Sequence, residues 1–242
     1  MWTISTTMSI FLLALVWVIN AQNTINWAGY QWTVRNAQNS GPGPNNWSSN
    51  NVWLDNDNNL HLKLSYSSTT GWTCAEVYTN VVFSYGTYRW FIEGPIDKLD
   101  PNVVLGLFTY QGLDGTNEID IEAARWGQKK ARASNLFYTV YPKILGNTQP
   151  VSNGTLISLQ GTYTTHQFTW TSQKISFQSQ HGFQISPNTN IFFSYQTPDS
   201  FGSSVPNGTA PVHMNLWAFQ GKPPMNGQEV EIIIHGFNYT QP

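Results

Sequence analysis

Residues 118–122 alternate acidic side chains with isoleucine, in the order Glu-Ile-Asp-Ile-Glu. Successive side chains of a β-strand point to opposite faces. A strand here would place the two isoleucines in a core and line up Glu118, Asp120 and Glu122 on the other face. Gathering like charges on one face is unfavourable unless they are used, and the chain has only 13 acidic residues. Paired carboxylates a few ångströms apart are what cleavage of a glycosidic bond requires.

Two other interpretations fit these five residues. An exposed edge strand can carry alternating charges that oppose aggregation. Carboxylates also bind calcium, although loops and backbone carbonyls usually supply such ligands. The residues around the pentapeptide have to decide between these interpretations.

The charge balance of the 242-residue chain argues against a polyanion as partner. The formal net charge is -2, and the 11 Lys and Arg residues are scattered, whereas nucleic-acid-binding proteins carry a basic stripe. Aromatic residues make up 14% of the chain, with 11 Trp. Aromatic rings serve as platforms for the apolar faces of neutral sugars, although they are also common in β-sheet cores. The composition suits a polysaccharide partner without establishing one, and we expect no nucleic acid.

The first 21 residues are typical of a secretory signal peptide. An apolar run, Ile-Phe-Leu-Leu-Ala-Leu-Val-Trp-Val-Ile, ends at Ile19 and is too short for a comfortable membrane span. We expect cleavage after Ala21 and a secreted, extracellular protein that leaves the membrane after cleavage. The residues before the run lack Lys and Arg, so an uncleaved anchor is the alternative.

The single cysteine and the glycosylation triplets add two expectations. Cys74 has no partner for an intramolecular disulfide, and we expect it to be buried. Four Asn-X-Ser/Thr triplets, whose use depends on the source, begin at Asn46, Asn153, Asn207 and Asn238.

Period-two alternation recurs along the chain, whereas no segment has a sustained helical period. Leu60, Leu62 and Leu64 alternate with polar residues, and turn residues join this run to residues 51–54 as a hairpin. The other predicted strands are 73–80, 86–93, 103–110, 117–126, 132–140, 167–171, 174–180, 212–217 and 229–238. Residues 36–51 and 186–211 are rich in Asn, Gly, Pro and Ser and are predicted to be loops.

Many short strands without intervening helices predict an all-β sandwich of two antiparallel sheets. The strand pattern continues on both sides of each loop-rich stretch, and no internal repeat is visible. We therefore expect one domain from residue 22 to residue 242.

Several motifs occur together in residues 66–239. Ala75-Glu76-Val77-Tyr78-Thr79 is followed by Tyr85-Gly86-Thr87-Tyr88, and Leu105-Gly106-Leu107-Phe108-Thr109-Tyr110 precedes the acidic pentapeptide. His166-Gln167-Phe168-Thr169-Trp170 with Lys174-Ile175, and then Met214-Asn215-Leu216-Trp217, follow it. In order and spacing, these segments resemble glycoside hydrolase family 16, whose signature is Glu-Ile-Asp-x-Glu.

The resemblance implies a concanavalin A-like β-jelly roll with a substrate cleft on its concave face. It implies a retaining endo-β-glucanase in which Glu118 is the nucleophile and Glu122 is the general acid/base. Asp120 is then expected to hydrogen-bond to Glu118 and to favour a protonated Glu122. The substrate contacts that the resemblance implies are Glu76, Trp126, Asn135, Phe137, Asn215 and Trp217.

We expect no cofactor, and a structural calcium ion is not indicated by the sequence. The protein is expected to be a monomer. His166 is more typical of a packing histidine than of a catalyst.

Departures from the family leave the polysaccharide open. Tyr78 stands where lichenases have Arg, Thr116 stands where they have Trp, and Ala123-Ala124 follow the second Glu in place of Phe-Leu. No residue is inserted between Asp120 and Glu122, which predicts a regular strand. Within the resemblance, this favours a mixed-linkage β-1,3-1,4-glucan or a related β-glucan.

Three other functions compete with hydrolysis. A xyloglucan-type transglycosylase would pass the glycosyl group to a sugar acceptor instead of water. A lectin-like module on the same fold would bind sugars without catalysis, but the paired glutamates argue against it. A structural extracellular β-sandwich is favoured only if the carboxylates lie far apart.

Overall fold

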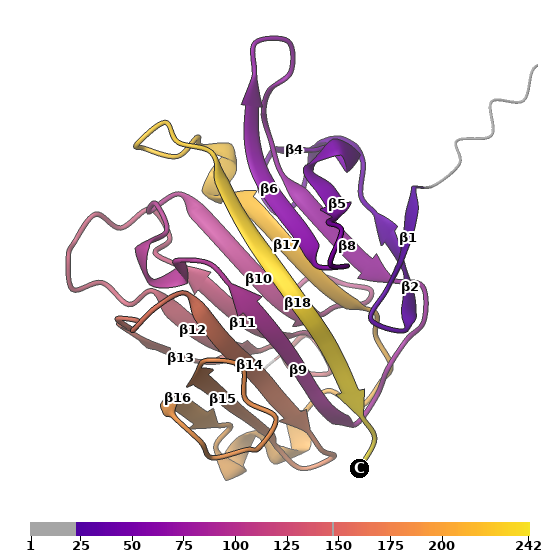
Figure 1. The fold of residues 1–242 in the computed structure, drawn as a ribbon. Coiled ribbons are helices and arrows are strands. Elements are labelled where there is room, and N and C mark those ends of the chain that lie inside the picture. Colours follow the sequence, from indigo (N-terminus) through magenta and orange to yellow (C-terminus); the bar gives the residue numbers. More distant parts are fainter. Residues whose placement is uncertain (1–22, 147) are drawn as a thin grey trace, which may run out of the picture.

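Two large antiparallel sheets make up most of the protein (Figure 1). The computed structural model describes residues 23–146 and 148–242. The predicted signal peptide lies outside the described residues. No helix in the described part of the chain has the length and apolar character needed to cross a membrane.

The first sheet, called the β11 sheet below, carries the acidic pentapeptide. Its eight strands are, in spatial order, β1 (Thr24–Trp27), β2 (Tyr30–Val34), β8 (Ala75–Thr79), β17 (Val212–Ala218), β10 (Val103–Thr109), β11 (Ile119–Ala124), β12 (Leu136–Val140) and β13 (Val151–Thr155).

The second sheet, called the β9 sheet, packs against it. Its strands are, in spatial order, β16 (Ile191–Gln196), β15 (Ile175–His181), β14 (Tyr163–Trp170), β9 (Gly86–Glu93), β18 (Val230–Thr240), β6 (Leu60–Ser67) and β5 (Val52–Leu54), with β7 (Gly71–Thr73) paired to β6. Short 3-10 turns are η1 (Ser49–Asn51), η2 (Ile96–Lys98), η3 (Asp199–Ser204) and η4 (Phe219–Gly221). The predicted all-β jelly-roll sandwich is confirmed.

The core lies between the two sheets and is built by alternation. Along β9, Tyr88, Trp90 and Ile92 are buried, and the residues between them are partly exposed. From the other sheet, Ile119 and Ile121 of β11 enter the same core. Each fully buried side chain of this size contributes about 1.5–3 kcal/mol relative to exposure, so Ile119 and Ile121 hold β11 against the core. The opposite face of the β11 sheet, called the open face below, points away from this core. Cys74 is also buried, as predicted.

A polar network crosses the core between the sheets. The hydroxyl of Tyr138 on β12 donates to Oγ of Ser179 on β15 at 2.6 Å. His166 shares hydrogen bonds with Ser179 Oγ at 2.7 Å and with Thr164 Oγ1 at 2.9 Å. Burial lowers the pKa of His166 to about 3, so the ring is neutral. The packing role expected for His166 is confirmed.

Both segments predicted as loops contain regular structure. Residues 36–51 hold β3 (Ala37–Ser40), β4 (Asn45–Trp47) and η1, and residues 186–211 hold β16 and η3. The sequence also did not predict β1, β2 or β13. The edge strand β13 is Val-Ser-Asn-Gly-Thr, which has weak strand propensity, and it forms because β12 supplies its hydrogen-bond partners.

Candidate active site

β11 pairs residue by residue with both of its neighbours, and its register defines the site. Glu122 lies opposite Gly106 on β10 and Phe137 on β12. Gly106 in turn pairs with Asn215 on β17, which pairs with Glu76 on β8. Facing residues of an antiparallel pair point to the same side. These five residues therefore form a row across the open face of the β11 sheet, called the Glu122 row below.

A second row lies one step along the strands. Asp120 faces Phe108 on β10, which pairs with His213, which pairs with Tyr78. The His213 ring stacks between Tyr78 and Phe108, with ring centroids 5.2 Å and 5.0 Å away. This aromatic ridge borders the Glu122 row. His213 alternates with Asn215 and Trp217, so strand periodicity could have found it, although no motif marked it.

The three carboxyls of the pentapeptide share the open face. Glu118 directly precedes β11, Asp120 is 4% exposed and Glu122 is partly buried. Burial, reinforced by the Glu118 charge, raises the pKa of Glu122 to about 8. Burial and the charges of both glutamates raise the pKa of Asp120 well above its usual range. The three neighbouring carboxyls therefore bind protons more tightly than isolated carboxyls do.

Glu118 has distinct surroundings. Burial and the charge of Asp114 raise its pKa to about 7, and a hydrogen bond from Asp120 opposes this rise. The same hydrogen bond raises the pKa of Asp120, so Asp120 is the donor and Glu118 the acceptor. Asp114 itself accepts a hydrogen bond from the Tyr110 hydroxyl at 2.6 Å.

Tyr141 belongs to the same charged neighbourhood. Its backbone N–H donates to the carbonyl of Glu118 at 2.9 Å. Burial raises the pKa of its phenol, and the charges of Asp120, Glu118 and Glu122 add to the effect. The sequence did not indicate Tyr141, because it follows β12 and lies outside every motif.

Glu76 is not a free carboxylate. One oxygen accepts a hydrogen bond from Arg35 Nη1 at 2.6 Å, and the other lies 2.9 Å from His213 Nδ1. The Arg35 guanidinium also lies 4.3 Å from the ring centroid of Trp47. Glu76, which was predicted to contact the substrate, lies in the Glu122 row, but its carboxylate oxygens contact Arg35 and His213. No sequence pattern pointed to Arg35.

An aromatic group borders the Glu122 row on the side away from the ridge. Trp126 lies 6.0 Å from Phe137, 6.3 Å from Trp217 and 5.5 Å from Phe219, measured between ring centroids. Trp126 has a φ of 51°, which is strained for a bulky residue and is typical of turns and functional sites. The structure thus brings together the predicted residues Trp126, Phe137 and Trp217, and adds Phe219.

Asn135 does not join this face, contrary to the expectation of a substrate contact. Its Nδ2 donates to the carbonyls of Asp97 at 3.0 Å and Ile157 at 3.1 Å. Its Oδ1 accepts from the Ile157 backbone at 2.7 Å. The side chain is buried and ties together two backbone segments, a structural role that sequence spacing alone could not distinguish from substrate binding.

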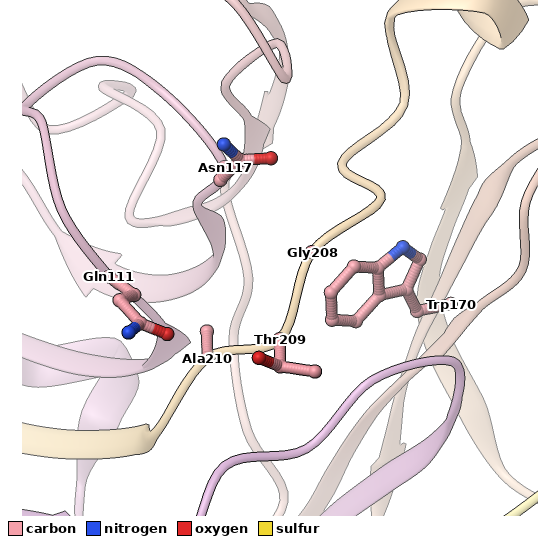
Figure 2. A pocket seen from close by; sticks show the side chains of 6 residues that line it. All are labelled: Gln111, Asn117, Trp170, Gly208, Thr209 and Ala210. Atoms are coloured by element: carbon pink, nitrogen blue, oxygen red, sulfur yellow. The ribbon is translucent and has the colours of Figure 1, made fainter.

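The pocket drawn in Figure 2 has a volume of about 320 Å³ and lies at the strand ends. Its lining residues are Gln111, Asn117, Trp170, Gly208, Thr209 and Ala210. Asn117 directly precedes Glu118, but Glu118, Asp120 and Glu122 are not among the residues that line the pocket. In the described ranges, no cluster of three His, Cys, Asp or Glu side chains is arranged to hold a metal ion.

Comparisons with known proteins agree with the fold. No family model matches the chain. A β-glucanase of Paenibacillus macerans is 25% identical over 199 residues, which are 81% of this chain and 71% of the relative. Among solved structures, the Bacillus licheniformis β-glucanase matches with a TM-score of 0.65 and 19% identity over 92% of this chain and 100% of the other.

Two further structures share the fold. A glycoside hydrolase family 16 endo-glucanase from Bacteroides ovatus matches with a TM-score of 0.63 and 13% identity over 86% of this chain and 94% of that one. A pseudo-β-1,3-glucanase of Mycobacterium tuberculosis matches with a TM-score of 0.63 and 18% identity over 87% and 91%. The chain therefore has the fold of the family 16 β-glucanases that its motifs implied, and it is related in sequence to a bacterial β-glucanase.

Proposed function

We propose that this protein is a retaining endo-β-glucanase. The observation that carries the proposal is the different state of two glutamates on one strand face. Glu118 accepts a hydrogen bond from Asp120, whereas burial and the Glu118 charge raise the pKa of Glu122 to about 8. One group is suited to attack and the other to donate a proton, which is the division of labour in double displacement.

In the proposed mechanism, a carboxylate oxygen of Glu118 attacks the anomeric carbon. Glu122 donates its proton to the glycosidic oxygen, which departs with the electron pair of the broken bond. Glu122, now a carboxylate, then takes a proton from water, and the water oxygen displaces Glu118 from the anomeric carbon. Asp120 donates a hydrogen bond to Glu118, which orients that carboxylate and favours its ionised form before the attack.

The substrate proposal is an internal β-linkage of a mixed-linkage β-1,3-1,4-glucan or a related β-glucan. The relatives named as β-glucanases support the class. The Trp126, Phe137 and Trp217 group offers ring surfaces beside Glu122 on which a sugar can stack. Tyr78 and His213 shape the other border, where lichenases have an Arg in the place of Tyr78.

The proposal extends to the cell biology of the protein. We infer secretion through the predicted signal peptide of residues 1–21, and a monomeric enzyme that needs no cofactor. The even spread of few charges on the sequence supports a neutral partner.

Release of reducing ends tests the proposal. Barley glucan, laminarin, xyloglucan, a galactan and agarose would be incubated side by side with the protein and with the Glu118→Gln variant. We expect release from a β-glucan by the wild type and a large loss in the variant. Equal, background-level release from every polysaccharide by both proteins would refute catalysis.

A non-catalytic carbohydrate-binding protein is the second candidate. The observation that favours it is the matching fold of the mycobacterial pseudo-glucanase. Affinity electrophoresis in gels containing each polysaccharide would detect it. Retardation by a glucan without any release of reducing ends would favour this candidate. Transfer of labelled xyloglucan fragments, in place of hydrolysis, would instead identify a transglycosylase.

A further inference from the structure

Gly106 leaves a gap in the middle of the Glu122 row. It pairs with Glu122 on one side and with Asn215 on the other. A Cβ atom at Gly106 would lie 2.5 Å from Oδ1 of Asn215, far inside van der Waals contact. The Asn215 side chain therefore lies over Gly106, in space that a side chain at position 106 would occupy.

Asn215 Oδ1 is a buried acceptor with an unusual lack of donors. The residue is 3% exposed, and no described residue donates a hydrogen bond to this atom. Leaving a buried acceptor unpaired destabilises the folded state. Buried polar atoms in native proteins rarely lack a partner, and a donor that exists only in one protonation state, such as a neutral carboxylic acid, would satisfy this one.

The neighbours of Asn215 in its row narrow the choice of donor. Glu76, on one side, already has Arg35 and His213 on its two oxygens. Glu122 lies on the other side, beyond the gap. Facing Cβ atoms on neighbouring strands are about 4.5–5.5 Å apart, so an atom above Gly106 lies within reach of a glutamate side chain.

We propose that Glu122 in its acid form donates a hydrogen bond to Oδ1 of Asn215 across the gap at Gly106. Asn215 is then a positioning residue for the general acid, and Gly106 is the residue that admits it; this role rests on the proposed function. The raised pKa of Glu122, about 8, supports the proposal, since the carboxyl keeps its proton at neutral pH.

The proposed contact changes the pKa of Glu122 in a definite direction. A hydrogen bond made by the neutral acid favours that form and raises its pKa. Removing the acceptor should lower the pKa of Glu122. The other ionisable groups near Glu122 are Glu118, Asp120 on β11, Tyr141 beyond β12, and Glu76 of the same row with its partner His213. The substitutions at Asn215 and Gly106 replace none of these groups.

Kinetics with two leaving groups test the role. Asn215→Ala removes the acceptor, and Gly106→Ala displaces it from the opposite side. General acid catalysis contributes about 10²–10⁴-fold, so misplacing the acid should reduce kcat/KM on barley glucan by about 10-fold or more. A 2,4-dinitrophenyl β-cellobioside needs no proton on its leaving group, and its kcat should change far less. The alkaline limb of the pH profile on barley glucan should move to lower pH in both variants.

Gly208→Ala is the matched control, because a Cβ atom there meets nothing within 4 Å. It should keep both activities and the wild-type pH profile. Thermal melting would verify that every variant is folded. Equal losses on both substrates with an unmoved alkaline limb would overturn the role, since that is the signature of lost sugar binding. A limb that moves to higher pH would also overturn it, because the amide would then be donating to the carboxylate.

A direct titration separates this inference from the proposed function. Carboxyl ¹³C NMR of labelled glutamate, with Glu122 assigned by Glu122→Gln, reports the pKa of Glu122 without any substrate. A lower value in Asn215→Ala than in the wild type would support the contact even if no polysaccharide were cleaved, and cleavage failure would refute only the glucanase proposal. An unchanged or higher value would refute the contact.

Discussion

Glu118 directly precedes β11 and Glu122 lies on it, and the surroundings of the two carboxyls differ. Glu118 accepts a hydrogen bond from Asp120, which lowers its pKa against the effects of burial and Asp114. No such donor opposes the rise at Glu122. The sequence pattern predicted the shared face of these carboxyls, but it could not predict which one would keep its proton, because that depends on burial and on neighbours such as Asp114.

This difference predicts unequal consequences of truncating the two glutamates. Glu122→Ala should retain turnover of an activated aryl glycoside, because that leaving group needs no proton, and azide should raise its rate by replacing the missing base-assisted water. Glu118→Ala should neither turn over that substrate with retention nor form a covalent intermediate. Steady-state rates with and without azide, together with mass spectrometry of the trapped enzyme, measure both. Near-wild-type activity of Glu122→Ala on polysaccharide would show that the roles are assigned wrongly.

At the scale of elements, periodicity explains what could be predicted from the sequence. The segments that became β5, β6, β9, β10, β11 and β17 were all predicted from apolar runs bounded by turn residues. Strand β9 buries every second side chain, whereas β10, β11 and β17 bury most of theirs. The edge strands β13 and β16 were missed, since pairing with a neighbour stabilises them more than their own propensity does. Arg35 and Gly106 entered the site only through strand register, which the sequence of one chain does not reveal.

β11 as an element predicts the stereochemistry of the reaction. Only three residues separate the two glutamates along the chain, which favours carboxyls that flank the scissile bond closely, with little room for an attacking water between them. We predict retention of the β configuration at the anomeric carbon. Proton NMR of the first-formed product, recorded before mutarotation, would show the β anomer. An initial α anomer would exclude the double-displacement mechanism.

The regularity of β11 also predicts substrate preference. Residues 119–124 pair with β10 without a register shift, so nothing re-aims the strand between Asp120 and Glu122. We expect faster initial rates on barley glucan than on laminarin. Xyloglucan and agarose, assayed at equal mass concentration, serve as comparison substrates. A clear preference for laminarin or agarose would mean that the borders of the site, such as the Tyr78–His213–Phe108 ridge, outweigh strand regularity.

At the scale of the whole molecule, His166 and the carboxyls at 118, 120 and 122 make the stability of the fold depend on pH in opposite directions. His166 has a lowered pKa of about 3, so the folded state resists protonation and loses stability as pH falls below the usual histidine range. The carboxyls have raised pKa values, so the folded state holds protons that the unfolded chain releases. Their contribution makes stability fall as pH rises from about 4 towards 8. The protein should therefore be most stable in mildly acidic solution.

The carboxyl part of this behaviour can be isolated with Asp120→Asn, which keeps a donor for Glu118 and removes one buried ionisable group. Each unit of pKa shift corresponds to about 1.4 kcal/mol, and 1 kcal/mol moves Tm by about 2–4 °C in a domain of this size. We expect the variant to melt several degrees higher than the wild type at pH 8, while its activity falls. The difference should be much smaller at pH 4, where the folded carboxyl is protonated and about half of the unfolded carboxyl is as well. Asp199→Asn, which changes an exposed carboxylate, should leave the pH dependence of Tm as it is in the wild type. Differential scanning calorimetry at pH 4, 6 and 8 makes the comparison. A variant that melts lower than the wild type at pH 8 would show that Asp120 stabilises the fold as an ionised group. The three carboxyls at 118, 120 and 122 would then not reduce the stability of the folded state.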